Sequence, residues 1–395
     1  MASQEMYRLG SQSSVIRELF TYGQEQAAKV GAENVFDFSI GNPTVPAPED
    51  VRQAIIDIVS SRPSVAVHGY TAAAGDTAVR KGLADYMNKT YDARVSADNF
   101  YMTCGAAASL TITLKALVES PDDEVIVIAP FFPEYTAFIA NAGAKTVIIP
   151  PDTDRFQISL DLLEKAITPQ TRAIIINSPN NPSGVVYASE TYEALSVLLT
   201  KKSKEVGHPI YVIADEPYRE IIYDGLPILY VPKYYSNTII CYSYSKSISL
   251  PGERIGYILV PDCAADSKAV YTAVCGAGRS MGFVCAPHLF QDVVLRCLGR
   301  TSDISIYDGN RRLLYNGLKE MGYDCVYPGG AFYLFVKSPE ADANSFSAKA
   351  KALNLLIVPA DSFGCPGYVR ISYCVDPEMI KRSLPVFQKL MDSYR

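Results

Sequence analysis

Several short apolar runs of the chain end in residues that could take part in chemistry. Asn177, Asp215 and Ser243 each end such a run, and Gly105 ends another and opens a helical pattern. Lys246 comes shortly after Ser243. A desolvated lysine amine can condense with an aldehyde, and a nearby carboxylate can keep a neighbouring nitrogen base protonated. The alternative interpretation is that each residue only forms a loop, because Asn, Asp, Ser and Gly favour turns.

The apolar runs themselves predict one sheet. Their lengths and their Val, Ile and Tyr content are typical of buried strands, and amphipathic helical patterns lie between several of them. This alternation predicts an α/β fold in which helices cover both faces of a mostly parallel seven-stranded sheet. The predicted strands are 99–104, 124–129, 145–149, 172–177, 210–215, 238–243 and 255–260, and the clearest helical patterns are 106–119, 134–141 and 190–206.

The chain direction decides where the polar residues meet. The carboxyl ends of parallel strands lie at one edge of a sheet, and open α/β sheets bind ligands at that edge. An amide, a carboxylate, a hydroxyl and an amine are therefore expected to converge there. The runs 238–243 and 255–260 are too close for a helical crossover, so one of them is expected to be antiparallel.

The pattern of predicted elements changes near residue 286, because helical patterns dominate after it and the predicted strands are few and short. We predict a large domain over residues 46–285 and a smaller α+β domain formed by residues 1–45 and 286–395. The predicted helices of the smaller domain are 286–299, 304–321, 343–353 and 377–394, and its predicted strands are 331–336 and 368–372.

Composition argues against several function classes. The 395-residue chain has a net charge of -6 with scattered Lys and Arg, which argues against nucleic-acid binding. No apolar run approaches the ~18–20 residues of a membrane span. Nine cysteines without a CxxC pair indicate reduced thiols in a cytoplasmic protein. The three histidines have no ligand-like spacing, so no metal site is expected.

Longer motifs extend the pattern around these residues over nearly the whole chain. With them the chain resembles the class I/II aminotransferases, which are fold-type I enzymes of the aspartate aminotransferase type that use pyridoxal 5'-phosphate. Ser-x-Ser-Lys with an Arg eight residues later, preceded by Asp-Glu-Pro-Tyr, is the most specific part. The motifs are Ile40–Pro43, Tyr70–Gly75, Pro130–Tyr135, Asn181–Gly184, Asp215–Tyr218, Ser243–Lys246, Pro251–Tyr257 and Val369–Ser372.

The resemblance implies a catalytic group of three residues. Lys246 would carry the cofactor as a Schiff base and move the proton between the substrate and the cofactor. Asp215 would pair with the pyridine nitrogen and keep the ring an electron sink. Tyr218, together with Asn181, would hydrogen-bond the ring oxygen. The alternatives are a surface lysine, a turn or cap aspartate and a half-buried tyrosine.

The resemblance also implies a phosphate site, a substrate site and a shared active site. Phe132 would lie against the ring face, unless it is a core aromatic. Tyr70 would reach the phosphate of the neighbouring subunit, which makes a homodimer the expected assembly. The remaining cofactor-binding residues are Gly105, Ala106, Ala107, Ser243, Ser245 and Arg254. The residues expected to bind substrate are Gly41, Asn181 and Arg370, of which Arg370 would clamp the α-carboxylate unless it forms a surface ion pair.

Three departures from the family pattern matter for specificity. Ser183 replaces a more usual threonine, and Ala106 and Ala107 leave only backbone donors for the phosphate. Ala107 also stands where some relatives place a lysine against a distal carboxylate, which puts strict aspartate specificity in doubt. Arg279 could supply that cation across a dimer interface, and a surface role for it is equally compatible with the sequence. Residues 276–282 resemble a dinucleotide loop, but the glycine spacing is wrong and a helical pattern precedes them.

The function expected from the resemblance is amino transfer between an amino acid and a 2-oxo acid. Aspartate, alanine and aromatic amino acids are the candidate donors. A β-eliminating carbon–sulfur lyase on the same fold is the nearest alternative, because the fold alone does not decide the reaction. A non-catalytic cofactor-binding regulator is less compatible, because the forty residues before Gly41 are short and acidic.

Overall fold

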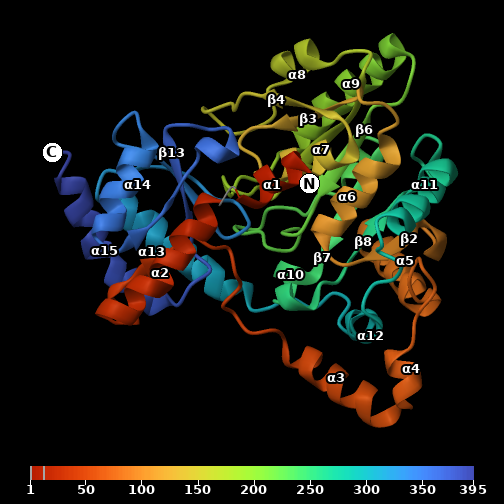
Figure 1. The fold of residues 1–395 in the computed structure, drawn as a ribbon, viewed down its shortest axis with the longest axis horizontal. Helices are drawn as coiled ribbons and strands as arrows, with labels where there is room; N and C mark the ends of the chain where they lie inside the picture. The colour runs from red at the N-terminus through yellow and green to blue at the C-terminus, as the bar shows by residue number, and fades with distance from the viewer. Residues whose placement is uncertain (1, 12–13) are drawn as a thin grey trace.

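A seven-stranded sheet forms the centre of the larger unit in this computed structural model, which describes residues 2–11 and 14–395 (Figure 1). The strand order is β2-β8-β7-β6-β5-β3-β4. Four neighbouring pairs are parallel, and β8 is antiparallel to both β2 and β7. The strands are β2 Phe100–Thr103, β3 Glu124–Ile128, β4 Lys145–Ile149, β5 Thr171–Asn177, β6 Tyr211–Asp215, β7 Thr238–Ser243 and β8 Gly256–Leu259.

All seven predicted strands are therefore confirmed, and β8 is the antiparallel one. Its reversal leaves β2 running in the same direction as β7, β6 and β5. The carboxyl ends of β2, β5, β6 and β7 consequently lie at the same edge, as the sequence predicted.

Helices cover both faces because the strands alternate their side chains. Val125 and Val127 of β3 face one hydrophobic core, whereas Ile126 and Ile128 face another. The first core is covered by α6 Ala106–Leu117, α7 Glu134–Ala142 and α11 Ser267–Ser280. The second is covered by α3 Glu49–Ser61, α4 Ser64–His68, α5 Thr77–Tyr91, α8 Leu160–Ala166, α9 Ser189–Val206 and α12 His288–Arg296.

The smaller unit contains a four-stranded antiparallel sheet, β12-β13-β10-β9, and a two-stranded parallel sheet, β1-β11. Several of its helices begin where an aspartate side chain accepts a backbone N–H, as Asp342 and Asp376 do. The strands are β1 Phe36–Asp37, β9 Asp324–Val326, β10 Tyr333–Lys337, β11 Leu355–Leu356, β12 Val358–Pro359 and β13 Tyr368–Ser372. The helices are α2 Val15–Val30, α13 Ile304–Glu320, α14 Ala343–Ala352 and α15 Pro377–Asp392, and the short helix α1 Gln4–Ser11 precedes α2 in the chain.

Helix α12 packs against the large unit, whereas the sequence predicted that residues 286–299 belong to the smaller domain. Val293 and Val294 are fully buried in the same core as α3 and α5. Arg62, directly after α3, also forms an ion pair with Asp292 of α12. The hydrophobic contacts place the boundary after α12, because a helix joins the core in which its apolar stripe is buried.

None of the helices in the described ranges is long and apolar enough to cross a membrane. The same ranges contain no group of His, Cys, Asp and Glu side chains that could hold a metal ion.

Candidate functional site

A cavity of about 310 Å³ opens at the carboxyl edge of the large sheet, where the smaller unit faces it. Strands β5, β6 and β7 and the start of α6 supply one wall, and strands β10 and β13 supply the other. The predicted site residues that line it are Gly41, Ala106, Ala107, Phe132, Asn181, Asp215, Tyr218, Ser243, Ser245, Lys246, Arg254 and Arg370.

Lys246 projects its amine into this cavity from the short helix α10, Tyr244–Ser247. The Ser243 side chain begins that helix by accepting the backbone N–H of Ser245. Lys246 Nζ donates to the carbonyl oxygen of Gly41 at 2.6 Å. The lysine pKa is lowered to about 8, mainly by burial; the Cys374 thiol opposes this, and the charges of Arg370 and Arg254 contribute to it. A neutral, nucleophilic amine is thus accessible near neutral pH.

Asp215 lies opposite, at the end of β6, with its two carboxylate oxygens in different environments. Oδ2 accepts a hydrogen bond of 2.5 Å from the Tyr135 hydroxyl. Oδ1 is buried and has no hydrogen-bond partner. The Asp215 pKa is raised to about 7, mainly by burial; the Tyr135 hydrogen bond opposes this, and the nearby Glu216 carboxylate adds to it. An unpartnered buried carboxylate oxygen of this kind fits a charged N–H donor supplied by a ligand.

An anion site lies at the start of α6. The helix presents backbone N–H groups at Ala106 and Ala107, and Arg254 faces the same point. Gly105 has φ +88°, and a side chain there would come within 3.0 Å of Arg254 Nη2. The hydroxyls of Ser243 and Ser245 are 2.7 Å apart beside it. Cation, hydroxyls and helix N-terminus together suit a phosphate group.

Arg370, on β13, is a buried cation on the opposite wall. Its guanidinium donates to Asn181 Oδ1 at 3.1 Å and to the backbone oxygen of Ser39 at 2.5 Å, while Nε has no partner. Burial lowers the Arg370 pKa from its usual value. Because no carboxylate of the described residues pairs with it, Arg370 is suited to binding one from a ligand bidentately. The alternative of a surface ion pair is therefore wrong, since Arg370 is 2% exposed.

Asn181 and Tyr218 are held between these groups. The Asn181 backbone N–H donates to Asn177 Oδ1 at 2.8 Å, and Asn177 in turn donates to the Asp215 backbone oxygen at 2.8 Å. The Tyr218 hydroxyl lies 2.8 Å from the Tyr333 hydroxyl. These bonds fix the loops after β5 and β6 relative to each other.

Apart from Gly105, which lies beside Arg254 without lining the cavity, two residues with predicted roles lie outside the cavity lining. The Tyr70 side chain is 94% exposed, and Arg279 is exposed on the last turn of α11. Neither can act on the cavity of its own chain in this arrangement. Each retains its predicted role only through a second subunit.

Several lining or supporting residues received no role from the sequence, and three of them are Ile16, Tyr135 and Tyr333. Tyr135 lay within a motif and Tyr333 within a predicted strand, and a buried tyrosine in a chain with 27 of them carries no distinguishing signal. Ile16, on α2, is distant in sequence from every other lining residue. Only the folded chain brings these three to the cavity.

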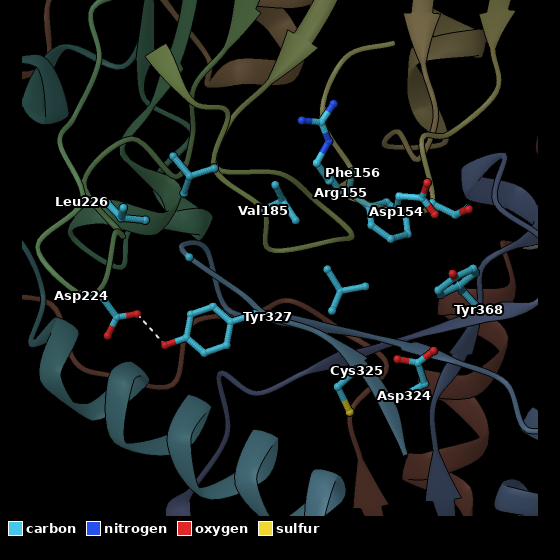
Figure 2. A pocket seen from close by; sticks show the side chains of 14 residues that line it. Asp154, Arg155, Phe156, Val185, Asp224, Leu226, Asp324, Cys325, Tyr327 and Tyr368 are labelled. Carbon is cyan, nitrogen blue, oxygen red and sulfur yellow. Dashed lines mark hydrogen bonds between the residues drawn. The ribbon is translucent and has the colours of Figure 1, made fainter. Parts of the chain in front are cut away.

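A larger cavity, of about 580 Å³, lies elsewhere at the junction of the two units (Figure 2). Its lining includes Asp154, Asp324 and Asp224, and the last accepts a 2.7 Å hydrogen bond from Tyr327. Hydrogen bonds from Arg311 and Tyr327 hold the Asp224 pKa at about 2. No lysine lines this cavity, so the amine chemistry belongs to the smaller one.

The sequence profile of the family described as aminotransferase class I and II matches residues 33–386. The chain belongs to this family. The resemblance predicted from the motifs is thus confirmed, and the chain is an aminotransferase of a family that uses pyridoxal phosphate. Individual relatives agree. The aspartate aminotransferase of Thermotoga maritima is 30% identical over 91% of this chain and 92% of its own.

Solved structures of this family share the fold. An amino transferase from Eubacterium rectale is 58% identical, with a TM-score of 0.99 over 100% of this chain and 99% of its own. The Thermotoga maritima aspartate aminotransferase structure is 27% identical, with a TM-score of 0.87 over 99% and 100% of the two chains. The predicted fold class is confirmed by both.

The residues present fit pyridoxal phosphate. Asp215 Oδ1 offers an unpartnered buried acceptor for the pyridinium N–H, and Gly105 leaves room for a phosphate beside Arg254. Lys246 supplies the amine for the aldehyde. Phe132 is within the lining, and its ring meets that of Tyr135 edge-on at 5.7 Å.

Tyr135 therefore has a testable role in holding Asp215. We expect Tyr135→Phe to weaken retention of pyridoxal phosphate about tenfold, because loss of one hydrogen bond to a charged group is worth ~1.5 kcal/mol. Cofactor dissociation during dialysis, followed by visible absorbance, measures this. Tyr187→Phe is the control, because it removes another buried hydroxyl, one with no hydrogen bond to Asp215. Equal retention by both variants would remove Tyr135 from the site.

Proposed function

We propose that this aminotransferase holds pyridoxal phosphate on Lys246 and moves the amino group of an amino acid to a 2-oxo acid. The observation that carries the proposal is the pairing of a buried amine with a buried, half-unpartnered carboxylate across one cavity. The cofactor, when bound, supplies an aldehyde and an electron sink. The side chains of the cavity supply everything else.

The proposed roles follow from position. Asp215 holds the proton of the ring nitrogen, because its free oxygen is a buried acceptor. Arg370 binds the substrate α-carboxylate and orients the Cα–H bond. Lys246, released from the cofactor, carries the proton from Cα as a neutral amine of lowered pKa. Asn181 and Tyr218 donate to the ring oxygen, and the start of α6 with Arg254 and the Ser243 and Ser245 hydroxyls binds the phosphate.

For the substrate we propose aspartate, alanine or an aromatic amino acid, with glutamate and 2-oxoglutarate as the second pair. The named relatives support this range, since they include an aspartate aminotransferase from Thermotoga maritima and an aromatic-amino-acid aminotransferase from Thermococcus litoralis. The cavity lining includes the apolar Ile16 and Ile40, and its described cations other than Arg370 are Lys246 and Arg254, which the proposal assigns to the cofactor. Arg279 of a second subunit would supply one for a distal carboxylate.

We further propose a cytoplasmic location. The nine cysteines are all free thiols, which suits a reducing compartment.

We propose a homodimer because the aromatic side chain of Tyr70 is 94% exposed and does not line the cavity of its own chain. Val65 and Val284 are exposed on neighbouring segments, at 84% and 55%, and would be covered by a second copy.

We expect Lys246→Ala and Tyr70→Phe variants, each weak alone, to recover activity when co-refolded. A mixed dimer contains one intact site, whereas a monomer contains none. Absence of any recovery alongside confirmed mixing would contradict shared sites.

The lowered pKa of Lys246 predicts how fast the apoprotein captures pyridoxal phosphate. The reactive neutral amine is the major form above pH 8 and falls about tenfold per pH unit below it. Capture, measured by stopped-flow absorbance, should therefore accelerate up to about pH 8 and then level off. The reference is a free alkylamine, whose rate should rise further, toward its pKa of about 10.4. Lys246→Arg should capture nothing, and a rate that rises unchanged past pH 10 would contradict the burial argument.

The reaction itself is tested with a panel of amino acids and 2-oxo acids. We expect nitrogen exchange for at least one pair, with no pyruvate or ammonia released when the 2-oxo acid is left out. Product amino acids are measured by chromatography. Accumulation of pyruvate and ammonia without exchange would identify a lyase instead.

A further inference from the structure

Tyr333 lines the cavity and contacts three of its residues: Tyr218, Gly41 and Arg370. It begins β10, opposite Ser372 of β13, and is 2% exposed. Its side chain therefore reaches the cavity from the smaller unit, whereas Lys246 and Asp215 come from the larger one. A tyrosine in this position brings both a ring face and a hydroxyl to the junction.

The hydroxyl of Tyr333 lies against two neighbours. It is 2.8 Å from the Tyr218 hydroxyl. It also occupies the space in which a side chain at position 41 would project, so only glycine fits there. The carbonyl oxygen of that same Gly41 accepts the hydrogen bond from Lys246. Tyr333 thus fixes the backbone segment that receives the lysine amine.

The ring of Tyr333 lies under the Arg370 guanidinium, whose central carbon is 4.8 Å from the ring centroid. The Phe363 ring lies 5.1 Å from the same carbon. Arg370 also donates to Asn181 and Ser39, but its Nε is unpartnered and no carboxylate of the described residues pairs with it, so these aromatic contacts add to its orientation. Loss of the ring would leave the guanidinium less constrained.

The donor order of the tyrosine pair follows from proton counting. Each hydroxyl has one proton, so one tyrosine of the pair donates to the other. If Tyr218 gives its proton to a ligand oxygen, it must accept from Tyr333, and the two donations reinforce each other. The other ionisable groups that act on the pair are Arg370, Cys374 and Asp215, and Lys246 lines the same cavity.

We propose that Tyr333 is a positioning residue with two separable parts: its hydroxyl strengthens the hydrogen bond from Tyr218 to the cofactor ring oxygen, and its ring orients Arg370 toward the substrate carboxylate. This rests on the proposed function, because it presupposes pyridoxal phosphate in the cavity. Stabilising negative charge on the ring oxygen disfavours protonation of the adjacent nitrogen. The hydroxyl therefore lowers the pH at which the bound cofactor changes its visible absorption.

Two substitutions separate the two parts. Tyr333→Phe keeps the ring and removes the hydroxyl, whereas Tyr333→Leu removes both. For Tyr333→Phe we expect the absorption midpoint of the holoenzyme to rise on the order of half a pH unit, from the loss of one net hydrogen bond. The dissociation constant of this variant for a substrate amino acid should change less than about twofold, once it is corrected for the shifted protonation of the bound cofactor. For Tyr333→Leu that constant should rise about tenfold, with the same midpoint shift.

Tyr223→Phe is the matched control. Tyr223 is also a buried tyrosine, but its hydroxyl donates to the backbone oxygen of Ala331 and does not line the cavity. It should leave both the absorption midpoint and the dissociation constant at the wild-type values. Thermal unfolding of all three holoenzymes reports stability separately.

The outcomes are distinct. If Tyr333→Phe has the wild-type absorption midpoint, the hydroxyl does not act on the cofactor through Tyr218, and the inference is wrong. If Tyr333→Leu binds the amino acid as tightly as Tyr333→Phe, the ring does not orient Arg370. Lower melting temperatures without either shift would mean a purely structural tyrosine. A wild-type protein that binds no pyridoxal phosphate would instead overturn the proposed function.

Discussion

The structure depends on a carboxylate and an amine that are both buried and both face one cavity. Burial acts on them in opposite directions, raising the pKa of Asp215 and lowering that of Lys246, because each charged form is disfavoured away from water. Neither group is neutralised by the other. A ligand that offers an N–H donor to the first and an aldehyde to the second relieves both penalties at once. The desolvation of these two groups therefore favours binding of a ligand that carries both an N–H donor and an aldehyde.

The two units share the work of building that cavity. The sheet edge presents Asp215, Lys246 and the start of α6, and the smaller unit presents Arg370 and Tyr333. Gly41 lies between them, with its carbonyl on the lysine and its missing side chain against the tyrosine. Because the proposed cofactor-binding groups come mainly from one unit and the proposed carboxylate-binding Arg370 from the other, relative movement of the units would change the proposed substrate site more than the proposed cofactor site.

Much of this arrangement was predictable from particular residues. The strands 124–128 and 238–243 are nearly continuous apolar runs, because both of their faces are covered by helices, and such runs are visible in sequence. Asp215 stands out because it ends another such run, and Lys246 stands out because it closely follows Ser243, which ends the run 238–243. The position of α12 was not predictable, because an amphipathic stripe shows that a helix packs but not against which core.

The sequence by itself determined the order of the strands along the chain, the residue types at their carboxyl ends and the family to which the chain belongs. These are local properties, set by periodicity and by the chemistry of single side chains. Only the tertiary structure decided that Tyr135 holds one oxygen of Asp215 and leaves the other free, that Tyr333 joins Tyr218 to Arg370, and that Tyr70 faces away from its own cavity. Hydrogen-bond partners and exposure depend on contacts between segments far apart in the chain, and no local pattern encodes those contacts.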